Sequence, residues 1–153
     1  MSRTAPIEIA RLPCACATTR RASRAITQLY DRWLRPHGIE APQFAILNLL
    51  DALGVSNQTT IGAHFNLDKT TLSRNIKLLH KNGWITLKPG ADRRERSVIL
   101  TAAGRARLSA ARPGWRKAQE AMEVAMGRKG WHEAFRTLDA VTTAAQAAIR
   151  SAG

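Results

Sequence analysis

The spacing of apolar residues predicts helices over most of the chain. Residues 13–35 carry apolar side chains at helical spacing, and residues 42–53 are apolar on nearly every side, as in a buried helix. Two further helices are expected, one from residue 102 to about residue 126 and a last one over residues 131–150. The chain is therefore expected to be mainly helical.

Three residues are expected to interrupt the C-terminal helical pattern. Proline lacks the helical N–H, so Pro113 should kink the first of these two helices. Gly127 and Gly130 lie where the apolar periodicity stops. The pattern thus predicts two separate helices after residue 101.

Between these helices the period of the pattern changes. Two short helices are predicted over residues 58–65 and 69–82, with a tight turn between them and Asp68 as the N-cap of the second. Apolar residues then alternate with a period of two over residues 84–88 and 96–101. This middle part therefore predicts a helix-turn-helix followed by a β-hairpin with a charged tip.

The chain is strongly basic, and part of the charge is concentrated. Its 24 Lys and Arg against 11 Asp and Glu give a net charge of +13. Residues 69–96 alone hold eight basic and two acidic residues, a local net charge of +6. A domain this basic usually binds a polyanion, most often nucleic acid, although an arginine-rich composition alone could also produce a basic surface.

The predicted helix over residues 69–82 has two different faces. On a helical wheel its three core-forming residues fall within roughly 60° of one another: Leu72, Ile76 and Leu79. Hydroxyl and basic side chains gather on the opposite side: Thr70, Ser73, Arg74, Lys77 and Lys81. That face could be an ordinary solvated surface, but short hydroxyls and long cations beside an arginine-tipped hairpin suit a helix in a DNA major groove.

Two stretches, "LDKTTLSRNIKLLHKNGWI" and "DRRERSVILTAAGR", resemble the MarR family of bacterial transcriptional regulators. In that family a recognition helix precedes a G-W/L-I strand, and a hairpin wing carries D-x-R before an L-T-x-x-G segment that opens the dimerisation helix. Asp92 and Arg94 match D-x-R, and Leu100, Thr101 and Gly104 match L-T-x-x-G. The resemblance covers about residues 12–150, including the order of the helices.

The resemblance implies a mainly α fold with a small β-hairpin wing. A winged helix-turn-helix DNA-binding lobe would occupy residues 37–101, and a helical dimerisation layer residues 12–36 and 102–150, after a flexible N-terminus at residues 1–11. It also implies a homodimer whose two lobes grip double-stranded DNA at a pseudo-palindromic operator, with half-sites about one helical turn apart.

By the same resemblance, Asp92 positions Arg94 and does not itself touch DNA. The expected DNA contacts lie on the recognition helix and on the wing: Thr70, Thr71, Ser73, Arg74, Lys77, Arg93, Arg94 and Arg96.

Members of the family commonly release DNA when a small molecule, often an aromatic acid, lodges between the dimer layer and the DNA-binding lobe. The first two predicted helices would line that crevice, with these candidate contacts: Arg20, Arg21, Tyr30, Trp33, His37 and Phe44. Arginines could pair with a carboxylate, and the aromatic rings could pack against the ligand. The alternative is that Trp33 and Phe44 are ordinary core residues and that the arginines are solvent-exposed.

The two cysteines of the chain lie in "LPCACATTRR", and one of them also matches a family pattern. A MarR subgroup senses organic hydroperoxides through an early cysteine, and Cys16, Arg24, Tyr30 and "PQF" fall in the same register. Tyr30 of the same chain lies about 21 Å along the same helix, so Cys16 could meet only the partner subunit's Tyr30, and only if the two first helices run antiparallel in the dimer. Further tyrosines of that subgroup are replaced here by Arg20 and Ala41, although Arg20, one helical turn away, could favour the Cys16 thiolate. Two small side chains at a buried interface, with no function, remain the alternative.

Other classes of function find little support. The sequence has no H-E-x-x-H motif, no phosphate-cradling glycine loop and no Ser/His/Asp order, so we do not expect an enzyme. Neither a cofactor nor a metal is expected, since Cys14 and Cys16 would be about 200° apart on a helix and the four histidines show no ligand spacing beside them. With no secretory signal and no apolar run of about 20 residues, we expect a bacterial cytoplasmic, nucleoid-associated protein with no membrane partner. A non-specific architectural DNA-binding protein would share the charge and stays an alternative.

Overall fold

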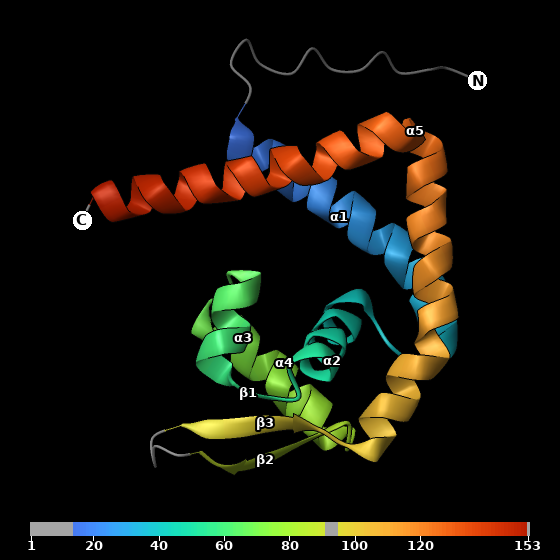
Figure 1. Cartoon of the computed structure of the whole chain (residues 1–153), viewed down its shortest axis with the longest axis vertical. Coiled ribbons are helices and arrows are strands. Elements are labelled where there is room, and N and C mark those ends of the chain that lie inside the picture. The colour runs from blue at the N-terminus through green and yellow to red at the C-terminus, as the bar shows by residue number, and fades with distance from the viewer. Residues whose placement is uncertain (1–13, 91–94, 153) are drawn as a thin grey trace. The chain divides into compact units, whose positions relative to one another are not determined.

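A computed structural model describes residues 14–90 and 95–152, and its contacts divide the chain into two compact units between Ala111 and Arg112. The first unit contains α1 (Ala15–Leu34), a short 3₁₀ helix η1 (Arg35–His37), α2 (Ala41–Leu53), β1 (Val55–Asn57), α3 (Gln58–Phe65), α4 (Lys69–Lys81), β2 (Ile85–Pro89), β3 (Arg96–Leu100) and the start of α5 (Ala102–Ser151). The second unit is the remainder of α5. The order of elements confirms the predicted mainly helical fold with a β-hairpin, while residues 1–11 lie outside the described part of the chain (Figure 1).

A third strand, β1, was not predicted. The sheet is antiparallel in the order β1-β3-β2, with Val55 opposite Ile99 in one pair and Ile85 opposite Leu100 in the other. A strand of three residues is too short to show a period-two pattern, so its pairing with β3 decides its conformation. In Figure 1 the helices α2, α3 and α4 group on one side of the β2–β3 hairpin.

Local caps determine where the two short helices begin and end. The Asn57 side chain accepts a hydrogen bond from the Thr60 N–H at 2.7 Å and begins α3, which ends at Asn66 in the left-handed conformation, with φ of 51°. The chain restarts as α4 at Lys69. Gly62 allows α3 to approach α4 closely, because a Cβ there would lie 3.1 Å from a methyl carbon of Leu72. The predicted helix-turn-helix is thus present.

The core of the first unit draws apolar side chains from α1 to α4, from β2 and β3, and from the start of α5. Burying each of these side chains contributes roughly 1.5–3 kcal/mol through its removal from water. The largest fully buried ones are Leu34, Ile39, Ile46, Leu47, Leu50, Ile61, Leu79, Ile85, Val98, Leu100 and Leu108.

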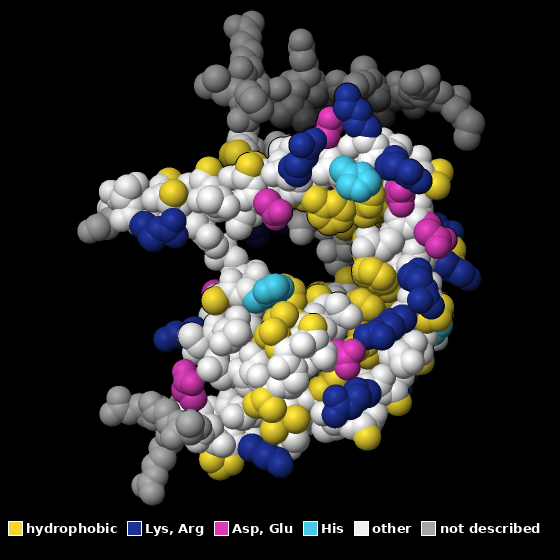
Figure 2. All heavy atoms as spheres, in the orientation of Figure 1, with side chains coloured by type: hydrophobic (Ala, Val, Ile, Leu, Met, Phe, Trp, Pro, Cys, Tyr) yellow, Lys and Arg dark blue, Asp and Glu magenta, His cyan; other side chains and the backbone are white. Residues whose placement is uncertain are grey.

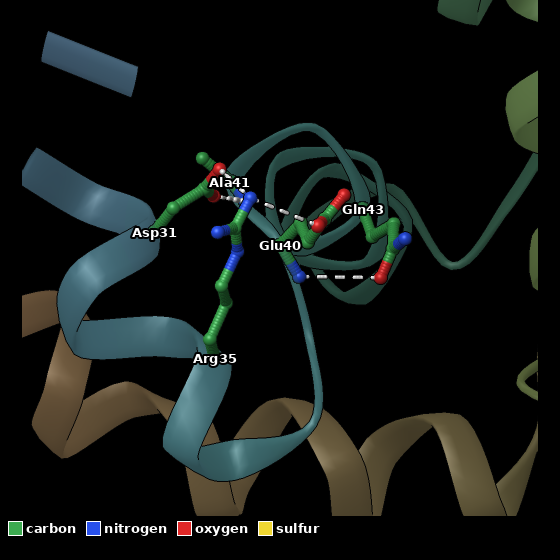
Figure 3. A network of polar contacts seen from close by, with 5 residues as sticks. All are labelled: Asp31, Arg35, Glu40, Ala41 and Gln43. Carbon is green, nitrogen blue, oxygen red and sulfur yellow. Dashed lines mark hydrogen bonds and ion pairs between the residues drawn. The ribbon is translucent and has the colours of Figure 1, made fainter. Parts of the chain in front are cut away.

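A buried carboxylate joins the end of α1 to the start of α2 (Figure 3). Asp31 accepts a hydrogen bond from the Ala41 N–H at 2.7 Å, and its other oxygen lies 3.4 Å from an Arg35 nitrogen, which also lies 3.3 Å from Glu40. The Glu40 N–H in turn donates to the Gln43 side chain at 3.2 Å. Asp31 thus satisfies a backbone donor that the first turn of any helix leaves without a partner inside the helix.

The start of α5 is fastened to the start of β2. The Thr101 hydroxyl donates to the Gly83 carbonyl at 2.7 Å and accepts from the Gly104 N–H at 3.0 Å, and the Thr101 N–H donates to the Trp84 carbonyl at 3.0 Å. Gly104 packs so closely that a Cβ there would collide with the Trp84 carbonyl oxygen. This contact gives the L-T-x-x-G segment a physical meaning: the threonine caps the helix and the glycine leaves room for the strand.

The interruption of α5 differs from the prediction. Only Gly127 departs from helical angles within the helix, with φ of 71° and ψ of 154°, so two helices meet there, as expected. Pro113 and Gly130 keep a helical backbone. For Gly130 the expected break was therefore wrong, because a glycine can stay helical at a modest cost.

The Gly104 contact predicts a large effect for a single methyl group. Gly104→Ala should lower the free energy of unfolding by at least about 2 kcal/mol, because the backbone at Trp84 cannot move away without disturbing the core. Urea denaturation followed by circular dichroism, at one fixed protein concentration, measures this loss.

Gly130→Ala is the matched control, since it adds the same methyl group to the same helix. A Cβ at Gly130 meets no atom closer than 3.7 Å, so this variant should be neutral or stabilised by up to about 1 kcal/mol. Equal free energies for the two variants would contradict the close approach at Gly104.

Candidate nucleic-acid interface

Helix α4 separates a buried face from a basic one, as predicted. Leu72, Ile76 and Leu79 are buried in the core of the first unit. The opposite face is open to solvent, with Ser73 half-buried and these side chains exposed: Thr70, Thr71, Arg74, Lys77 and Lys81. A helix anchored on one side and cationic on the other can enter a DNA groove without losing core contacts.

The first turn of α4 is held by Asp68. Its carboxylate accepts from the Thr71 N–H at 2.9 Å and from the Thr71 hydroxyl at 2.6 Å. These bonds, the hydroxyl bond first, lower the pKa of the Asp68 carboxyl from its ordinary value. The Thr71 hydroxyl therefore donates its proton to the Asp68 carboxylate. In the predicted contact with DNA, this hydroxyl could act only as a hydrogen-bond acceptor.

The structure describes the wing, which is the β2–β3 hairpin, except for residues 91–94 at its tip. The Gly90 N–H donates to the Glu95 carbonyl at 2.9 Å and closes the hairpin, and Arg96 is exposed at the start of β3. The other predicted wing contacts, Arg93 and Arg94, and the neighbouring Asp92 lie outside the described residues.

A groove of about 600 Å³ runs between α3, α4 and the base of the wing. Its apolar floor includes Leu67 and Leu72, and Lys69, Ser73 and Arg96 add polar and cationic groups from two elements. The structure thus brings both parts of the expected DNA-binding surface, α4 and the wing, to one concave site, to which α3 also contributes. Asn57 and Lys69, at the starts of α3 and α4, also line the groove. The N-terminus of a helix carries a partial positive charge, which favours anions.

The predicted ligand contacts are divided between surface and core. Arg20 and Arg21 are exposed on α1, Trp33 and His37 are half-buried, and Phe44 is 4% exposed, within the core. Tyr30 is half-buried on α1, and its burial raises the pKa of its hydroxyl. The groove beside α4 includes none of these six residues.

The two cysteines begin α1 without both belonging to it. Cys14 is the N-cap residue, with φ of −88° and ψ of 113°, and Cys16 lies in the first turn. Both thiols are free and exposed. The prediction that the helix includes both residues was therefore wrong, and their separation on a helical wheel does not apply.

Sequence reasoning missed residues that connect elements far apart in the chain. Arg107 donates to the His37 carbonyl at 2.6 Å, and its guanidinium carbon lies 5.3 Å from the centre of the Trp84 ring. Asn57 donates to Glu95 at 3.0 Å and so ties α3 to the wing. Gly38, left-handed and in close contact with Arg107, was the one local signal near the first of these contacts.

The described residues contain no group of three or more His, Cys, Asp or Glu side chains that could hold a metal ion. Nor does any helix in residues 14–90 and 95–152 have the length and apolar character needed to cross a bilayer.

The Asp68 cap predicts a pH-dependent stability. Since the folded state lowers the pKa of this carboxyl, the cap stabilises the protein above the ordinary pKa of 3.8, and its contribution is lost as the pH falls through the folded value. Asp68→Ala should therefore lower the urea midpoint at pH 7, and the difference from the wild type should shrink below about pH 4.

Asp68→Asn serves as the control, because its side-chain oxygen can still accept from the Thr71 N–H but does not titrate. It should lose less stability than the alanine variant at pH 7. A wild-type-to-alanine difference that is the same at pH 7 and pH 3 would contradict this account of the cap.

Comparison with known proteins shows which protein family this chain resembles. A model of the MarR family matches residues 37–95. An uncharacterized HTH-type transcriptional regulator of Bacillus subtilis, YwoH, is 34% identical over 80 residues, which are 52% of this chain and 58% of that protein. The chain thus spans less than two thirds of the length of this curated relative.

Solved structures extend the similarity over most of the chain. The transcriptional regulator MosR of Mycobacterium tuberculosis, in complex with DNA, superposes with a TM-score of 0.81 and 37% identity, covering 89% of this chain and 98% of that one. A probable transcriptional regulator from Pseudomonas aeruginosa gives a TM-score of 0.72 and 25% identity, covering 84% and 96%.

Proposed function

Because the chain belongs to the MarR family, we propose that it is a homodimeric transcriptional regulator, not an enzyme, that binds double-stranded DNA at a pseudo-palindromic operator. The observation that carries the proposal is the exposed basic face of α4, anchored by a buried apolar face and set beside the wing. The DNA complex of MosR supports it, since that relative matches this chain over nearly its whole length. In this proposal the protein acts on the nucleoid in the bacterial cytoplasm, most simply as a repressor.

The proposed contacts divide into base readers and phosphate binders. Arg74 and Lys77 extend from the exposed side of α4 and are assigned to the major groove, where arginine can bind guanine through two hydrogen bonds. Thr70 and Ser73 would bind phosphate or base edges, and Arg96 belongs to the wing, which reaches the backbone or the minor groove. Arg93 and Arg94 keep the same role by family resemblance.

The homodimer is supported by apolar side chains on the second half of α5 (Figure 2). Phe135, Leu138 and Val141 are each 42–48% exposed and repeat at a spacing of three residues. A row of this kind is normally covered by another protein surface. We assign the α5 helix, together with α1, to the dimerisation layer, which leaves residues 37–101 as the DNA-binding lobe.

DNA binding should show a steep dependence on salt. With six to ten phosphate contacts, the affinity for a duplex selected from a random pool should fall by roughly 10³ to 10⁵ between 50 and 200 mM salt. Arg74→Ala should weaken binding by about 1–3 kcal/mol and relax the base preference at one position of each half-site. Fluorescence anisotropy titrations measure both effects.

Arg32→Ala is the matched control, because it removes an exposed arginine from α1, outside the proposed interface. It should leave the affinity unchanged. Footprinting separates a regulator from an architectural protein: a discrete, two-fold symmetric protected site supports the regulator, and uniform coverage of the DNA supports the alternative.

For regulation we propose that a small aromatic or phenolic acid releases the repressor. Arg20 and Arg21 are exposed on α1 and could pair with a carboxylate, while Trp33 is half-buried about 20 Å further along the same helix, so the Trp33 that meets the same ligand would be the partner subunit's Trp33. Tyr30 and His37 would contribute polar groups. Phe44 is assigned to the core, where its ring could form only the floor of such a site.

A thiol switch is the second candidate, favoured by the exposure of both cysteines. The Cys16 thiolate would attack a hydroperoxide, forming a sulfenic acid at its sulfur and releasing an alcohol. The Tyr30 hydroxyl is protonated near neutral pH, as needed to donate a hydrogen bond to the sulfur of the other subunit.

A thermal-shift screen separates the two candidates. A bound acid at 100 times its Kd should stabilise the protein by about 2.7 kcal/mol and raise Tm by several degrees in both the wild type and Cys16→Ser. A hydroperoxide response that disappears in Cys16→Ser but persists in Cys14→Ser would support the thiol switch. If neither kind of compound shifts Tm, both sensing proposals are wrong.

A further inference from the structure

Among the described residues that line the groove between α3, α4 and the wing, Glu95 is the single acidic one. It lies next to Arg96 and shares the groove with Lys69 and with the starts of two helices. All of these features attract phosphate, whereas a carboxylate repels it. An acid in the lining of a surface suited to DNA requires an explanation beyond overall charge.

Glu95 makes one hydrogen bond within the wing and one to the start of α3. Its backbone carbonyl accepts from the Gly90 N–H at 2.9 Å, which closes the hairpin below the tip. Its side chain accepts from the Asn57 side chain at 3.0 Å, and the other end of that amide caps α3 by accepting from the Thr60 N–H at 2.7 Å. The Glu95 side chain thus adds a hydrogen bond to the β1–β3 pairing, in which Asn57 lies opposite Ser97, and so reinforces the link between the wing and the start of α3.

The charge of Glu95 should affect specific and non-specific binding unequally. Binding to arbitrary DNA comes almost entirely from phosphate contacts, so one repulsive charge reduces it directly. Binding to an operator draws part of its energy from base contacts, which require the wing and α4 to be held in one register. Specificity often arises in this way, from an element that penalises the wrong partner more than the right one.

We propose that Glu95 is a specificity-determining residue of DNA binding. Through Asn57 it positions the wing relative to α3, and through its charge it weakens binding to non-specific DNA more than binding to the operator. This inference rests on the proposed function and assigns Glu95 and Asn57 a role that the predicted set of DNA contacts does not include.

Two substitutions separate the charge from the positioning. In Glu95→Gln the amide oxygen can still accept from Asn57, so only the charge is lost, whereas Glu95→Ala removes both. Affinities are measured by anisotropy for a selected operator and for a scrambled duplex of equal length, at one salt concentration. Urea denaturation first establishes that each variant is folded.

For Glu95→Gln, non-specific affinity should rise about three- to tenfold and operator affinity should rise less, so the ratio of the two falls. Glu95→Ala should match Glu95→Gln on scrambled DNA but bind the operator more weakly, because the hydrogen bond that Asn57 donates to the side chain is lost. Glu120→Gln is the control: it removes one exposed carboxylate from α5, outside the groove, and should leave the ratio unchanged.

An unchanged or increased ratio in Glu95→Gln would overturn the role of the charge, and equal operator affinities of the two Glu95 variants would overturn the role of Asn57. In both cases the proposed function would stand, because the wild type still binds DNA. A wild-type protein that binds neither duplex in a salt-dependent way would overturn the proposed function and this inference together.

Discussion

The close approach of Gly104 to the carbonyl of Trp84 is the contact on which the arrangement of the first unit depends. β2 follows directly from α4, and α5 follows directly from β3, so this one contact links α4, the β2–β3 hairpin and the start of α5. A backbone carbonyl cannot rotate away as a side chain can. The position therefore accepts only glycine, and the packing density of the core transmits any shift to its neighbours.

The helices at the two ends of the lobe are capped by residues that also connect elements. Asp31 supplies an acceptor for the first turn of α2, and Thr101 does so for the first turn of α5 while donating to the chain just before β2. Helix starts leave several backbone donors without partners, so each must find an acceptor elsewhere. For α2 the acceptor comes from another helix, and for α5 the local cap Thr101 also donates to Gly83, so in both cases a cap becomes a tertiary restraint.

On the proposed DNA-binding surface, too, single capping side chains make two hydrogen bonds each. Asn57 caps α3 with one end of its amide and binds the wing with the other, and Asp68 caps α4 through both groups of Thr71. The exposed cations of α4 are thus carried on a helix whose start is fixed. Preorganisation of this kind lowers the entropy cost of binding, which is where affinity is often lost.

The sequence alone determined the helices, the helix-turn-helix, the hairpin and the two faces of α4, because these follow from apolar periodicity and from short-range caps such as Asp68. The pattern within any one segment could not show the pairing of β1 with β3, the contact of Asn57 with Glu95, or the hydrogen bond from Arg107 to His37. Each of these contacts joins residues that are 38 to 70 positions apart. Gly127 and Gly130 are a second case in which the sequence alone did not determine the structure. Both look like helix breakers in the sequence, and only the folded chain decided that the first breaks the helix while the second continues it. Pairings between distant segments are chosen by packing and by backbone hydrogen bonding, which the order of residues within a segment does not specify.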